Sequence, residues 1–160
     1  MESFEVWLPD RRPNGRNLAC DIEPPVAAFG VNNVSNGVQR PTDATNAWLA
    51  DLNDKRPTLT LSWPQTQTIA RIELSLDTDY DHPMESVLMG HPERAMPFCL
   101  KQFRVLDNHD KVLWEEADNH QSRYTITFAA PIETNTLRLE LLESWGHVPA
   151  ALFEIRCYAA

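Results

Sequence analysis

The sequence is poor in the patterns that mark common catalytic and cofactor sites. Its 160 residues include only five glycines, and none lies in a G-x-G-x-x-G dinucleotide-binding turn, a phosphate-binding P-loop or a G-x-S-x-G nucleophile turn. The three cysteines, Cys20, Cys99 and Cys157, contain no C-x-x-C pair, which argues against a zinc finger and against a disulfide framework. We therefore expect that this chain is not an enzyme by itself.

Long apolar runs and an excess of basic charge are also missing. The sequence contains no run of about 18 apolar residues, which is the length needed to span a membrane. Residues 1–20 carry acidic side chains in place of an apolar block, so we expect no signal peptide. The location of the protein is left open. The net charge is −9, which opposes binding to nucleic-acid phosphates or to an anionic membrane surface.

The sequence does contain segments in which polar and apolar residues alternate strictly, and these segments predict many short strands. Such strands, with turn residues every 8–15 positions, favour an all-β sandwich. We predict strands over 58–63, 69–76, 99–106, 111–117, 123–129, 136–142 and 151–158. The residues expected to be buried between two sheets are Ile72, Leu74, Ile126, Phe128, Leu137, Leu139, Phe153 and Ile155.

The chain divides into a polar lead-in, residues 1–16, and one domain, residues 17–160. Asp77–Pro97 is an unusually long connection between two strands, and such connections are often functional. Pro83 and Gly90 suit the start and end of a short helix, so we expect this connection to be ordered with a helix over Pro83–Met89. Its aliphatic side chains either fold back on the sandwich or dock a neighbouring domain.

Several short motifs, taken in order, resemble a known family. They are Asn33–Gly37, Asn46–Asp51, Asp77–Pro83, Phe98–Lys101, Asn119–Tyr124 and Phe153–Tyr158. Together they resemble the galactose-binding-like, discoidin-type jelly-roll β-sandwich, and in particular the C-terminal accessory domain of bacterial FAD-dependent oxidoreductases.

The resemblance implies a non-catalytic accessory module that binds carbohydrate. The alternative is a structural module that packs on the catalytic domain of the same polypeptide and binds no free ligand. FAD would belong to the parent protein, and this chain would hold no cofactor apart from a possible calcium ion.

Aromatic and polar residues in the loops are the candidates for sugar binding, because loops gather at the ends of a sandwich and an aromatic face suits a pyranose ring. Asp79, Tyr80 and His82 lie in the long connection, and Trp145 and His147 lie between the last two strands. By contrast, Trp63 and Trp114 lie in strands, and we expect them to pack against the sheet.

A structural calcium site is also implied by the resemblance, at Asn36 and Glu154. In this chain Asn36-Gly37 stands where the family usually has Asp-Gly, which removes a negative charge and weakens the case for calcium. An ion pair between Arg40 and Glu154 is the alternative. We expect Glu154 to point away from the face that carries Phe153 and Ile155.

Overall fold

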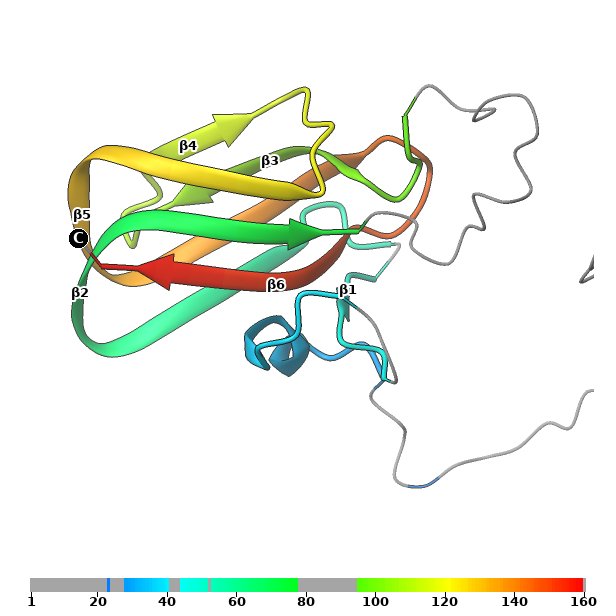
Figure 1. The fold of residues 1–160 in the computed structure, drawn as a ribbon, viewed down its shortest axis with the longest axis horizontal. Coiled ribbons are helices and arrows are strands. Elements are labelled where there is room, and N and C mark those ends of the chain that lie inside the picture. Colours follow the sequence, from blue (N-terminus) through cyan, green and yellow to red (C-terminus); the bar gives the residue numbers. More distant parts are fainter. Residues whose placement is uncertain (1–22, 24–27, 41–43, 52, 78–94, 160) are drawn as a thin grey trace, which may run out of the picture.

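The fold was analysed in a computed structural model, which describes residues 23, 28–40, 44–51, 53–77 and 95–159. Apart from one 3-10 helix, the regular secondary structure of these residues consists of β-strands (Figure 1). The elements are the 3-10 helix η2 (Val31–Ser35) and the strands β1 (Trp48–Leu49), β2 (Thr58–Leu76), β3 (Leu100–Leu106), β4 (Val112–Glu116), β5 (Arg123–Ser144) and β6 (Ala151–Tyr158). All strand pairs are antiparallel, in the order β1-β6-β2-β5-β3-β4.

Two of the strands are much longer than the sequence predicts. The segments 58–63 and 69–76 join in β2, and 123–129 and 136–142 join in β5. The β2–β5 pairing breaks between Ser62 and Gln67, where Pro64 has no N–H to donate, and again after Ile69. Such irregularities bend strands, and the paired ribbon curves over on itself there (Figure 1). The expected two sheets are therefore one sheet that folds into two layers.

The hydrophobic core lies between these layers. Ile72, Leu74, Ile126, Leu137, Leu139 and Ile155 are buried, as predicted. Phe128 is half-buried and packs against the core from its edge, which corrects its expected full burial. Phe103 on β3 is fully buried, and its ring meets that of Tyr124 edge-on, with centroids 5.0 Å apart.

A bulge in β6 breaks the alternation that the sequence suggests. Leu76 pairs with Leu152, but the preceding Ser75 pairs with Glu154, so Phe153 is an extra residue. Leu152 and Ile155 consequently both reach the core cluster, whereas Phe153 is buried outside it. Phe153 is therefore buried, as predicted, but it lies outside the cluster that Ile155 joins.

Several predictions fall on residues outside the described ranges. These are the lead-in 1–16, Cys20, the helix over Pro83–Met89, and the candidates Asp79, Tyr80 and His82. Within the described ranges, no helix has the length and apolar character needed to cross a membrane.

Candidate functional site

Three connections meet at one end of the sandwich, and we call this region the loop end. They are residues 95–99 before β3, the turn 117–122 between β4 and β5, and the loop 145–150 between β5 and β6 (Figure 1). Backbone hydrogen bonds join them. The Trp145 N–H donates to the Cys99 carbonyl at 3.0 Å, and the Gly146 N–H donates to the Pro97 carbonyl at 2.7 Å. A Cβ on Gly146 would lie 2.6 Å from the Cβ of Pro97, so this contact requires glycine.

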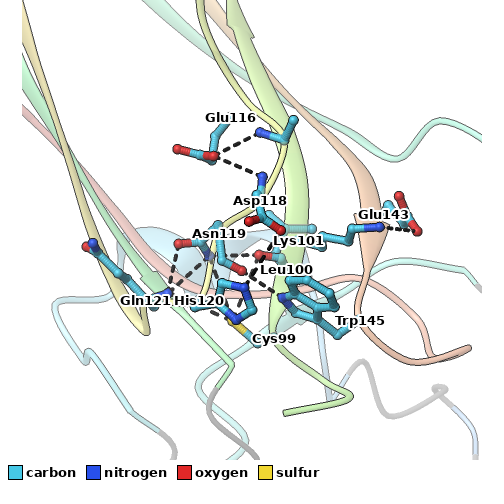
Figure 2. Close-up of polar contacts among 11 residues, drawn as sticks. Cys99, Leu100, Lys101, Glu116, Asp118, Asn119, His120, Gln121, Glu143 and Trp145 are labelled. Carbon is cyan, nitrogen blue, oxygen red and sulfur yellow. Dashed lines mark hydrogen bonds and ion pairs between the residues drawn. The ribbon is translucent and has the colours of Figure 1, made fainter. Parts of the chain in front are cut away.

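Asn119 organises the turn between β4 and β5. Its side chain is almost completely buried, and its Nδ2 donates to the Leu100 carbonyl at 2.7 Å and to the Gln121 carbonyl at 3.1 Å (Figure 2). Its Oδ1 accepts from the Gln121 N–H at 2.9 Å. The turn is thus fixed to the start of β3 by one buried amide.

Trp145 and His120 form a stacked pair at the surface of the loop end (Figure 2). Their ring centroids are 4.4 Å apart with an interplanar angle of 29°. The indole Nε1–H donates to the Asn119 carbonyl at 2.7 Å, which holds the half-buried Trp145 ring in place. The His120 side chain is 53% exposed, so the outermost aromatic surface of the pair is the imidazole.

Charged groups surround this aromatic pair. The ammonium of Lys101 lies 5.1 Å from the Trp145 ring centre, a cation–π contact, and 3.0 Å from a carboxylate oxygen of Glu143. The Asp118 carboxylate lies 3.7 Å from His120 Nε2. An aromatic pair with an exposed imidazole, an ammonium over the other ring and carboxylates nearby can pack against the apolar face of a sugar and hydrogen-bond to its hydroxyls.

Two titratable groups of the loop end have pKa values shifted by burial and by hydrogen bonding. Burial, with a contribution from the charge of Asp77, raises the pKa of the Cys99 thiol to about 11, so the thiol is protonated and unreactive at neutral pH. Glu116 accepts hydrogen bonds from the Tyr124 hydroxyl and from the backbone N–H groups of Asp118 and Ala117. These bonds, that from Tyr124 foremost, hold the pKa of Glu116 below its ordinary value.

The structure places Trp145 and His147 in the same loop at this end, with His147 exposed. The roles of Asp79, Tyr80 and His82 in sugar binding stay predictions, because these three residues lie outside the described ranges. Sequence reasoning missed His120 and Lys101, which come to Trp145 from the turn between β4 and β5 and from the start of β3. Their only signal was their place in motifs that resemble the family, 98–101 and 119–124.

The side chains at the predicted calcium position bond to other groups of the described structure. Asn36 uses both ends of its amide within the loop: Nδ2 donates to Asn46 Oδ1 at 3.1 Å, and Oδ1 accepts from the Val38 N–H at 2.8 Å. The buried Glu154 has Arg156 Nε 2.9 Å from its Oε2, and Arg156 Nη2 donates to the Gly37 carbonyl at 3.4 Å.

A guanidinium thus bridges the loop and Glu154. Among the described residues, no group of three or more His, Cys, Asp or Glu side chains could hold a metal ion. A calcium ion at this position stays a prediction of the resemblance.

Comparison with known proteins gives matches in structure alone. The sequence matches no family model and no curated protein. The fold is similar to the family 32 carbohydrate-binding module of Streptococcus pneumoniae EndoD, with a TM-score of 0.62 and 12% identity over 87% of this chain and 91% of that one.

Two further similar structures are of modules described with a sugar ligand. The family 32 module of C. perfringens NanJ in complex with galactose has a TM-score of 0.58 and 12% identity, covering 82% of this chain and 86% of that chain. Chitosan-binding module 1 of a chitosanase/glucanase from Paenibacillus sp. IK-5 has a TM-score of 0.61 and 11% identity, covering 84% and 88%. The chain therefore has the jelly-roll fold of these modules, as predicted.

Proposed function

We propose that the chain is a non-catalytic carbohydrate-binding module that binds sugars at its loop end. The observation that carries this proposal is the stacked His120–Trp145 pair, exposed at the end of a fold shared with sugar-binding modules. The inert thiol of Cys99 and the absence of catalytic sequence patterns fit a binding role.

The geometry suggests how a sugar is held. The apolar face of a pyranose ring packs on the exposed imidazole of His120 and on the accessible part of Trp145. Lys101 donates to ring hydroxyls, and the carboxylate of Glu143 accepts from them. Because the Trp145 indole is fixed by its bond to the Asn119 carbonyl, the platform loses little freedom on binding.

Calorimetric titration with galactose and with chitosan oligosaccharides tests this proposal. We expect His120→Ala and Trp145→Ala each to weaken binding by about tenfold, roughly the contribution of one aromatic contact. Val112→Ala, which shortens an exposed apolar side chain on β4, is the control and leaves binding unchanged. Saturable binding that survives both aromatic substitutions would remove the loop end from the site.

The resemblance to accessory domains of FAD-dependent oxidoreductases supports a second part of the proposal. We infer that the module belongs to a larger polypeptide whose catalytic domain binds FAD, because the motifs 77–83 and 98–101 match that group in order. A flavin-binding fingerprint encoded in the same open reading frame would support this, and its absence from the complete gene would contradict it.

A structural role against the catalytic domain is the second candidate function. It is favoured by the apolar side chains of Phe29, Val31 and Leu49, which are 46%, 48% and 36% exposed. Phe29 and Leu49 lie side by side, because the Leu49 N–H donates to the Phe29 carbonyl at 3.3 Å. If this surface docks the catalytic domain, replacing both residues with Ser loosens the association in the full-length protein, whereas sugar binding is unaffected.

A further inference from the structure

A second polar site lies on the outer face of the sheet, formed by β5, β2 and β6. Outward-facing residues of these strands align in rows across the sheet because of the strand register. Ser75 pairs with Arg123 on one side and with Glu154 on the other, and Glu73 pairs with Thr125 and with Arg156. The inward-facing residues between them, such as Leu74 and Ile155, belong to the core.

These rows form the floor of a pocket, which we call the sheet-face pocket. It has a volume of about 180 Å³ and is lined by Gln39 together with the residues of the two rows. A groove lined by Gly37, Arg40 and other residues of that loop continues from it, and both share Arg123 and Arg156. The pocket therefore has a sheet as its floor and the loop after η2 as one wall.

The carboxylates of the pocket already have cationic partners. Glu154, which is 3% exposed, pairs with Arg156 at 2.9 Å. Glu73 lies 3.2 Å from Arg71 Nε, and its other oxygen accepts from the Tyr158 hydroxyl at 3.1 Å. Both negative charges are thus compensated from within the sheet.

Arg123 is the cation of the pocket that pairs with neither of these carboxylates. It is exposed at the start of β5, and within the described part of the chain its guanidinium takes part in no ion pair or hydrogen bond. The pocket lining carries two arginines and two glutamates, but Glu73 pairs with Arg71 outside the lining and Glu154 pairs with Arg156, so the charge of Arg123 is available to a ligand although the whole chain carries a net charge of −9. A guanidinium binds a carboxylate through two parallel hydrogen bonds, so it is suited to an acidic ligand.

The other lining groups narrow the class of ligand. Ser75 and Thr125 contribute hydroxyls and Gln39 contributes an amide, all of which hydrogen-bond to neutral oxygens. A bare inorganic anion in the pocket would lie beside the carboxylates of Glu73 and Glu154. A sugar acid avoids this repulsion, because it presents hydroxyl donors to those carboxylates and its own carboxylate to Arg123.

We propose that the sheet-face pocket is a separate binding site for an acidic saccharide, with Arg123 holding the carboxylate of a sugar acid. This proposal rests on the proposed function only for its ligand class, since the pocket shares no residue with the His120–Trp145 pair.

The test is a titration of the full chain with D-galacturonate, with D-galactose as the neutral analogue and inorganic phosphate as the simple anion, followed by calorimetry and amide NMR shifts. We expect galacturonate to shift the amide signals of Ser75, Thr125 and Gln39 and to bind at least tenfold more tightly than galactose at these residues. Arg123→Gln should weaken galacturonate binding by about tenfold or more, the value of one charge-assisted bond.

Lys111→Gln is the matched control, because it removes one positive charge from the exposed turn between β3 and β4. Galacturonate binding that is retained in Lys111→Gln and in His120→Ala supports a separate site. The proposal is overturned if galacturonate does not bind, if Arg123→Gln binds it as the parent chain does, or if phosphate binds equally well. Loss of galacturonate binding in His120→Ala would also overturn it, by assigning the sugar acid to the loop end. Titration with neutral sugars tests binding at the loop end independently of the sheet-face pocket.

Discussion

Replacing Asn119 should destabilise the protein more than its small size suggests. Its buried side chain makes three hydrogen bonds with the backbone, two to the Leu100 and Gln121 carbonyls and one from the Gln121 N–H, besides a longer bond from Nδ2 to Cys99 Sγ at 3.7 Å. Each such bond contributes about 1 kcal/mol net, so Asn119→Ala should lower the free energy of unfolding by about 3 kcal/mol. For a chain of this size, that corresponds to a fall of about 6–12 °C in Tm.

Urea denaturation and thermal melting measure this loss. The control is Asn53→Ala, since Asn53 is exposed and its amide bonds only to the neighbouring Asp51 carboxylate in the described structure. That change should cost less than about 0.5 kcal/mol. A loss below about 1 kcal/mol for Asn119→Ala would refute the role assigned to this amide.

The variant Asn119→Asp tests which end of the Asn119 amide faces the Leu100 and Gln121 carbonyls. It keeps an acceptor for the Gln121 N–H but turns a carboxylate oxygen toward the Leu100 and Gln121 carbonyls. This repulsion should raise the pKa of the new carboxyl above the unfolded value of about 3.9. The variant should therefore be most stable at low pH, relative to the parent chain, and lose stability as the pH rises through the raised pKa. A loss independent of pH would contradict the geometry.

Three further predictions follow from the described contacts. Burial alone would raise the pKa of Glu140, but hydrogen bonds from Arg104 and Arg56 outweigh it and hold the pKa below the ordinary value. The stability from Glu140 is then present above pH of about 4.3 and lost as the pH falls through the lowered pKa, so Glu140→Gln should flatten the pH dependence of Tm in acid. Phe153→Ala should cost about 3 kcal/mol in urea denaturation, because the side chain is 3% exposed; a cost below about 1 kcal/mol would mean that the site collapses around the smaller residue. Removing calcium with a chelator should leave Tm unchanged, because Arg156 already neutralises Glu154; a clear fall would show a metal site that these contacts do not explain.

The strands could be predicted from alternation because burial of one face imposes a period of two on the residues themselves. Leu137 and Leu139, for example, are both buried as predicted. The bulge at Phe153 could not be predicted in this way. It depends on how Ser75 and Leu76 pair with the neighbouring strand, and nothing in residues 151–158 alone records that pairing.

The candidate sites, too, could be predicted only where they depend on local sequence and not on how the strands pair. Trp145 could be assigned to a loop from its neighbours in the sequence, but its stacking on His120 depends on two connections that meet only in the folded sheet. The sheet-face pocket was missed for a related reason. Arg123 and Glu154 stand on either side of Ser75 only because β2 lies between β5 and β6, and that strand order is a property of the topology.

The continuous ribbon of β2 and β5 has a consequence for how quickly the chain reaches its folded state. Thr58 pairs with Glu140 and Ser75 pairs with Arg123, so every contact along the ribbon joins residues far apart in the chain. Closing such loops costs entropy before the contacts form, which slows folding. The β3–β4 hairpin is local by comparison, since only a short turn joins its strands. Stopped-flow refolding should show one slow phase, on the order of milliseconds to seconds, that forms both layers together. Separate phases for the two layers would mean that the ribbon assembles in halves.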